Sequence, residues 1–206
     1  RHMGSKYPIF SFDFTGAKRG VLPASYDYLR LEGRMQYRLN LPPIGYSQLM
    51  LEGGKIFGKV PYLLLKLHEG NGTYFYDRYA FSCMNFYEFS SDAWISFFYE
   101  HHFNGFLLGR VPLLKKLNWR EVFVFKGVYG TLSARNDGSL PNTKAVMLFP
   151  VGMSSVEHPY LETGFGIENI FRLLRVDCIW RLTHHRAVPG LSIPTFTVNF
   201  SLNLKF

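Results

Sequence analysis

The segment TFTVNFSLNLKF, residues 195–206, alternates polar and apolar side chains without one exception. Successive side chains of a β-strand point to opposite faces, so this pattern indicates a strand with one apolar and one polar face. The segment is longer than an ordinary globular strand. It is long enough for a tilted strand to cross a bilayer, which takes about 9–11 residues. The apolar row consists of Phe196, Val198, Phe200, Leu202, Leu204 and Phe206.

Three further segments alternate in the same way, and their polar rows carry charges of both signs. The clearest is YLRLEGRMQYRL at residues 28–39, and YLETGFGIEN at 160–169 and LLRVDCIWRLTH at 173–184 follow it. Opposite charges on neighbouring strands can pair across a sheet. The charged rows contain Arg30, Glu32, Arg34 and Arg38 in the first segment and Arg175, Asp177 and Arg181 in the last.

Weaker alternation predicts five more strands, most of which carry aromatic residues on both faces. Together with the four clear segments they make nine strands. Bacterial single-chain outer-membrane barrels have an even number of strands, so either one of the nine is miscounted or a strand lies upstream of residue 1, and we favour the upstream strand. The weaker strands are predicted at residues 6–15, 47–58, 79–89, 93–103 and 119–132.

The direction of the two faces separates two kinds of β protein. The apolar faces of a soluble antiparallel barrel point into its core, whereas those of a membrane barrel face lipid and its polar faces line the lumen. A charged side chain on the lipid face costs about 2–4 kcal/mol at the bilayer midplane. We therefore predict an all-β fold, an antiparallel transmembrane β-barrel, with a soluble barrel as the alternative. Residues 1–206 would form about eight to nine of its strands, as one domain and as the C-terminal part of a larger barrel.

The composition agrees with a membrane protein built from strands rather than helices. Of the 206 residues 17% are aromatic and only 18% are charged, and no apolar stretch approaches the roughly 20 residues of a transmembrane helix. Two cysteines exclude a disulfide-stapled fold. The net charge of +8 suits contact with anionic outer-membrane lipids, including lipopolysaccharide. We expect no nucleic-acid partner, because no binding motif is present.

The charged rows are predicted to form a polar network in the lumen. They could line an anion-preferring pore or pack a plugged lumen. Glu100 and His102 share one face of the strand 93–103 but lack the further ligands that a metal needs, so we expect neither a metal nor a cofactor. The predicted network comprises Arg30, Glu32, Arg34, Arg38, Glu100, His102, Arg175, Asp177 and Arg181.

A second group of polar residues lies where the outer rim is predicted. A hydrolytic site there would combine a serine nucleophile, a histidine base and a carboxylate. The sequence does not fix the geometry of such a site, so we predict a non-enzymatic protein and keep a rim hydrolase of lipids or peptides as an alternative. The candidate residues are Ser154, Ser155, Glu157, His158 and His184.

The links between the predicted strands fall on alternate sides of the membrane. Outer-membrane barrels have short periplasmic turns and longer outer loops. The links at 40–47, 90–92, 133–158 and 185–194 are predicted outside, and those at 16–25, 59–72, 104–118 and 170–173 in the periplasm.

Two segments share the order glycine, basic residue, valine and proline, followed by leucines and lysines. They are GKVPYLLLKL at 58–67 and GRVPLLKKL at 109–117. Both are predicted to lie at the inner membrane interface, where lysine side chains can reach the lipid head groups. The alternative is a docking site for a periplasmic partner.

Several short motifs connect the chain to a known family. They are Met84-Asn85, Glu88-Phe89, Asp92, Glu100-His101-His102-Phe103, PLLKKL at 112–117 and Gly164-Phe165-Gly166. With them, the chain resembles the C-terminal barrel of a Bacteroidota outer-membrane family of unknown function that usually follows a carboxypeptidase-regulatory-like domain. The resemblance implies a Gram-negative outer-membrane protein in envelope biogenesis, scaffolding or transport, and it implies no catalytic residues.

The last strands carry a weaker resemblance, through GFGIE at 164–168 and LRVD at 174–177. They resemble the outer-membrane assembly-factor and surface-antigen superfamily, which implies an insertase as a further alternative. The chain has no clear Val-Arg-Gly-Phe/Tyr loop of that superfamily.

The end of the chain resembles the C-terminal signal that the barrel-assembly machinery captures by edge pairing. That machinery is therefore an expected partner, and other envelope proteins are further candidates. The signal would comprise Phe200, Leu202, Leu204 and Phe206.

Overall fold

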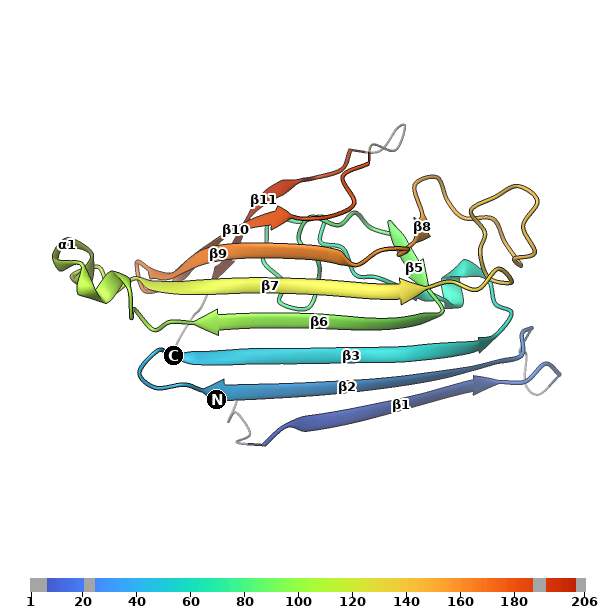
Figure 1. The fold of residues 1–206 in the computed structure, drawn as a ribbon, viewed down its shortest axis with the longest axis horizontal. Coiled ribbons are helices and arrows are strands. Elements are labelled where there is room, and N and C mark those ends of the chain that lie inside the picture. Colours follow the sequence, from blue (N-terminus) through green and yellow to red (C-terminus); the bar gives the residue numbers. More distant parts are fainter. Residues whose placement is uncertain (1–6, 21–24, 187–191, 203–206) are drawn as a thin grey trace.

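A computed structural model describes residues 7–20, 25–186 and 192–202 of the chain. The fold is all-β, with one large antiparallel sheet of eight strands and a small sheet of three (Figure 1). The large sheet runs in the order β1 (Ile9–Ala17), β2 (Tyr28–Asn40), β3 (Tyr46–Gly58), β6 (Ala93–His102), β7 (Arg120–Thr131), β9 (Tyr160–Ile170), β10 (Leu174–Arg181) and β11 (Phe196–Leu202).

The small sheet and the helical turns lie in the links. The small sheet consists of β4 (Lys66–Leu67), β5 (Phe89–Ser91) and β8 (Ser154–Ser155). The turns are the 3-10 helices η1 (Tyr62–Leu64) and η2 (Leu108–Arg110) and the helix α1 (Pro112–Lys115). None of the described helices is long and apolar enough to cross a membrane.

The predicted strand at 79–89 is wrong, and the large sheet therefore has eight described strands rather than nine. These residues form turns within the link between β3 and β6, residues 59–92, which we call the inner segment. Phe81 and Phe89 of this segment pack against the inward face of the sheet, whereas Phe86 and Tyr87 are exposed. The buried apolar cluster at this contact contains Met50, Phe81, Met84, Phe89, Phe98, Val128, Val156 and Tyr160.

Because 79–89 is not a strand, several links lie at a different end of the sheet from the one predicted. In the antiparallel order the links at 41–45, 103–119 and 171–173 share one end of the sheet, which we call the short-link end. The prediction that 40–47 lies on the same side as 133–158 is therefore wrong. The prediction that 16–25 and 59–72 lie on the same side as 170–173 is also wrong. At the other end, the long-link end, β1 is followed by β2, β3 by β6, β7 by β9 and β10 by β11 (Figure 1).

The two faces of the large sheet differ in the way that the alternation predicts. Leu29, Trp180 and Phe200 remain 44%, 41% and 40% exposed on the apolar face. On the opposite face Glu100 and Asp177 are 1% and 0% exposed. The polar side chains thus point toward the inner segment, while the apolar ones lie on the surface.

The sheet ends in two edges, which do not pair with each other among the described residues. On β1 the side chains of Phe10, Phe12 and Phe14 are 60%, 68% and 74% exposed. The backbone of Phe200 on β11 is bonded to the inner segment, because its N–H donates to Tyr74 O at 2.7 Å and its carbonyl accepts from Tyr76 N at 2.8 Å. The inner segment therefore covers part of one edge and leaves β1 open.

Candidate functional site

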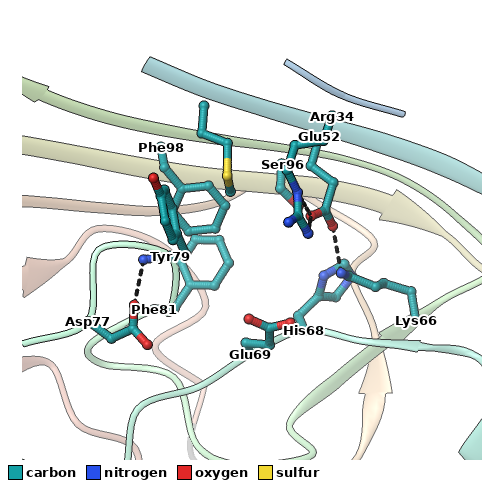
Figure 2. A pocket seen from close by; sticks show the side chains of 11 residues that line it. Arg34, Glu52, Lys66, His68, Glu69, Asp77, Tyr79, Phe81, Ser96 and Phe98 are labelled. Atoms are coloured by element: carbon teal, nitrogen blue, oxygen red, sulfur yellow. Dashed lines mark hydrogen bonds and ion pairs between the residues drawn. The ribbon is translucent and has the colours of Figure 1, made fainter. Parts of the chain in front are cut away.

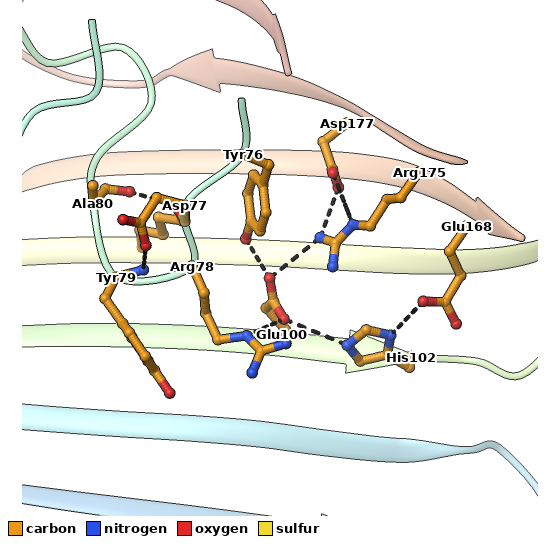
Figure 3. Close-up of polar contacts among 11 residues, drawn as sticks. Tyr76, Asp77, Arg78, Tyr79, Ala80, Glu100, His102, Glu168, Arg175 and Asp177 are labelled. Carbon is orange, nitrogen blue, oxygen red and sulfur yellow. Dashed lines mark hydrogen bonds and ion pairs between the residues drawn. The ribbon is translucent and has the colours of Figure 1, made fainter. Parts of the chain in front are cut away.

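Glu100 on β6 is the centre of a group of charged contacts between the sheet and the inner segment (Figure 3). Its carboxylate accepts a hydrogen bond from the Tyr76 hydroxyl and lies 2.7 Å from Nε of Arg78. It also lies 3.2 Å from Nη2 of Arg175, which comes from β10. Burying an ion is costly unless it is paired and hydrogen-bonded, and these three partners provide that compensation.

Three further residues, His102, Glu168 and Asp177, extend this group across the polar face of the sheet. His102 lies between two carboxylates, with Nε2 3.4 Å from Glu100 and Nδ1 3.2 Å from Glu168. Asp177 lies 2.8 Å from Nε of Arg175. The acids and the cations therefore alternate across the buried polar face, as Figure 3 shows.

A second pair of charged residues consists of Lys126 on β7 and Glu162 on β9, which are opposite each other in the register of the two strands. Both residues are 0% exposed. Nζ of Lys126 donates to the carbonyls of Asp77 and Ala80 at 2.8 and 2.6 Å. Lys126 thus holds two carbonyl groups of one turn of the inner segment, and Glu162 holds two amide groups of the same turn. Glu162 accepts hydrogen bonds from Ser82 N at 2.8 Å, Cys83 N at 2.7 Å and the Tyr160 hydroxyl at 2.6 Å.

Sequence reasoning missed this pair, although one signal was present. Lys126 is the only charged residue in the inward row of 122–128, where Val122, Val124 and Val128 are its neighbours on the same face. An isolated charge in a buried apolar row needs a partner from elsewhere in the fold. That partner is a turn whose position no local pattern reveals.

Arg181 on β10 holds the far end of the inner segment. Its Nη2 lies 2.6 Å from Glu88 Oε1, and its Nη1 donates to Cys83 O at 3.1 Å. The second oxygen of Glu88 accepts from Asn85 N at 2.8 Å. Burial raises the pKa of the Cys83 thiol to about 12, so this cysteine stays protonated at neutral pH.

A third group surrounds Glu52 on β3 and borders a pocket of about 290 Å³ (Figure 2). The carboxylate of Glu52 lies 2.6 Å from Arg34 Nη2 and 2.5 Å from Lys66 Nζ. His68 lies two residues after Lys66 and shares a 2.9 Å hydrogen bond with Ser91. Burial, and then the nearby charge of Lys66, lower the pKa of His68 to about 3, so its ring is neutral.

The structure divides eight of the nine predicted network residues among three places and sets Arg38 apart from them. Glu100, His102, Arg175 and Asp177 share the first group, Arg181 binds Glu88, and Arg30, Glu32 and Arg34 lie near Glu52. Arg38 makes no described ion pair, and its guanidinium stacks 3.9 Å from the ring centre of Tyr46. The inner segment lies between these groups, so they do not form one continuous lining.

The rim residues partly converge. Ser154, Glu157, His158 and His184 line a pocket of about 500 Å³, whereas Ser155 is not part of its lining. Nε2 of His184 is bonded to the carbonyl of His158 at 2.8 Å. Within the described chain no hydrogen bond joins the hydroxyl of Ser154 or Ser155 to a histidine ring. The pocket therefore lacks the serine–histidine contact of a nucleophilic site.

The predicted C-terminal signal is only partly within the described residues. Phe200 and Leu202 lie on the exposed apolar face of β11, at 40% and 63% exposure. Leu204 and Phe206 lie outside the described residues. The structure therefore describes only the first two residues of the predicted signal.

Comparison with known proteins gives one family. No curated protein matches the chain. Residues 1–134 match the family described as "Family of unknown function (DUF5686) C-terminal domain". The match spans more than half of the chain and includes β1 to β7 with the whole inner segment. The chain therefore belongs to the DUF5686 family, in the region of its C-terminal domain.

Proposed function

We propose that this chain forms wall strands of a transmembrane β-barrel in a Gram-negative outer membrane, with the inner segment filling the lumen. Its role would be non-enzymatic, in envelope biogenesis or as a scaffold, rather than as an open pore. One observation carries the proposal. The sheet buries its charged face and exposes its apolar face, which is the reverse of a soluble protein.

The energetics favour lipid as the medium around the exposed face. Soluble monomers rarely expose contiguous apolar patches larger than a few hundred Å². Here large apolar residues are exposed on the same face of successive strands, among them Leu29, Phe57, Ile95, Tyr129, Phe165 and Trp180. Contact with lipid would spare these apolar side chains the unfavourable contact with water.

The contacts of the inner segment favour a blocked lumen over a passive pore. Glu100, Lys126, Glu162 and Arg181 hold it from four different strands. A segment held through so many buried charged contacts would leave only slowly, because each broken pair leaves an uncompensated charge.

Quenching of tryptophan fluorescence by brominated phospholipids tests the medium around the sheet. Trp180 lies on the exposed face, whereas Trp94 is 5% exposed beneath Arg30 and Lys66. In reconstituted vesicles we expect acyl-chain bromine to quench wild-type protein strongly. With Trp119, which lies at the end of the sheet, replaced by phenylalanine in both variants, Trp180→Phe should remove most of the quenched signal, and Trp94→Phe should leave it. Quenching by aqueous iodide instead of bromolipid would overturn the proposal.

A further inference from the structure

The short-link end carries five basic residues and no acidic one over residues 103–120 and 169–173. Here the β6–β7 link, with η2 and α1, lies beside the β9–β10 link, and the side-chain amide of Asn169 donates to Asn118 O at 2.8 Å. Between the two links is a pocket of about 620 Å³. Its polar lining includes Asn104, Lys115, Asn118, Arg120, Asn169 and Arg172.

We infer that this pocket binds the phosphate group of an anionic phospholipid. The inference rests on the proposed membrane position, and it assigns a ligand to one end of the sheet. Three cations and three amides converge on the pocket, and this donor set matches phosphate oxygens.

The cations of this pocket are free of the pairing found elsewhere in the fold. Among the described residues Lys115, Arg120 and Arg172 make no ion pair, whereas Arg34, Arg78, Arg175 and Arg181 each do. The two acids nearest along the strands already have partners. Glu121 accepts from Leu108 N, and Glu168, opposite Arg120 in the register, binds His102 at 3.2 Å. The pocket therefore holds excess positive charge.

The surroundings of the pocket favour a lipid over a free anion. Leu113 and Phe171 are 81% and 86% exposed on the two links. Leu107, Val111 and Leu117 add further exposed apolar surface at the same end. Basic residues beside exposed apolar ones are typical of segments that lie in the head-group region, with the apolar side chains among the acyl chains.

The related segment at 58–67 provides an internal comparison. It has the same glycine–basic–valine–proline order, but it lies at the long-link end and packs inward. Val60 and Leu65 are 1% and 3% exposed, and Lys66 is paired with Glu52. Its predicted place at the inner interface, beside 109–117, is therefore wrong. In the segment at 109–117 both lysines, Leu113 and Leu117 are exposed, and Leu114 is half-buried. A lipid ligand would supply for 109–117 the contacts that the sheet supplies for 58–67.

Lipid titration of the full chain in neutral detergent tests the site, with native mass spectrometry as the readout. We expect phosphatidylglycerol to bind at least tenfold more tightly than phosphatidylcholine. The double variant Lys115→Gln/Arg172→Gln should lose that preference. The matched control Lys18→Gln/Arg135→Gln removes two exposed charges at the long-link end and should keep it. Heat-modifiable gel migration verifies that each variant is folded.

Two results would overturn the inference. One is equal binding of the two lipids, or equal loss of preference in both double variants. The other is competition by millimolar inorganic phosphate, which would indicate a site for free anions. Quenching of Trp180 by bromolipid separates the two proposals, because it would persist if only the phosphate site were wrong.

Discussion

At the scale of single residues, the Lys126–Glu162 pair shows how two buried charges can stabilise a backbone turn. Each charge compensates peptide groups that the fold removes from water, at distances of 2.6–2.8 Å. Breaking a buried pair by neutralising one partner typically costs about 3–5 kcal/mol. The position of the turn therefore depends on both charges.

Neutralising Glu162 tests this dependence. We expect Glu162→Gln to lower the unfolding free energy by about 3 kcal/mol, since Lys126 loses its counter-charge and one backbone amide loses its acceptor. The urea midpoint of heat-modifiable gel migration measures the change. Glu157→Gln, which alters an exposed carboxylate at the rim, is the control and should shift the midpoint little. Equal midpoints for the two variants would show that the pair does not hold the turn.

The neutral ring of His68 predicts a dependence of stability on pH. In the unfolded chain a histidine takes up a proton near pH 6.5, whereas the folded protein holds the pKa of His68 at about 3. The unfolded state therefore binds more protons below about pH 6.5, and stability falls as the pH falls. At pH 5 the loss is roughly 2 kcal/mol. His68→Gln should flatten the curve between pH 7 and 5, measured by denaturant unfolding. An unchanged slope would place His68 in contact with water.

At the scale of elements, alternation located all eight described strands of the large sheet, including the four with weaker patterns, and only the mixed pattern at 79–89 predicted a false one. The predicted strands at 28–39, 160–169 and 173–184 match β2, β9 and β10 within a few residues. The segment 79–89 carries aromatics on both faces, and either a strand or a packed turn can use such a pattern. Only the contacts with Lys126 and Glu162 distinguish the two.

Residues 69–87 of the inner segment can be deleted, because the residues on either side of them are close together. His68 N donates to Phe89 O at 3.1 Å, so the ends of a cut through 69–87 lie side by side. Replacing 69–87 with a short glycine–serine linker should turn a protein that does not conduct in planar bilayers into one that does. The control replaces exposed residues of the 132–159 link at 140–145 and should stay closed. Conductance by the wild type would contradict a blocked lumen.

At the scale of the whole molecule, the sequence by itself determined the class of fold and the sidedness of the sheet. Each depends on side chains two residues apart, which a strand places on one face whatever its neighbours are. The charged row of β10 therefore pointed to a buried polar face before any contact was known, whereas the charged row of β2 is only partly buried.

Only the tertiary structure decided which segment fills that polar face and which charges meet there. Glu100 lies far from Arg175 in the sequence, and β7 and β9 separate their strands in the sheet, yet the two side chains are 3.2 Å apart on its polar face. Contacts of that kind depend on the order of strands and on the path of a link. Neither leaves a local period in the sequence, so alternation alone could name the charged residues but not their partners.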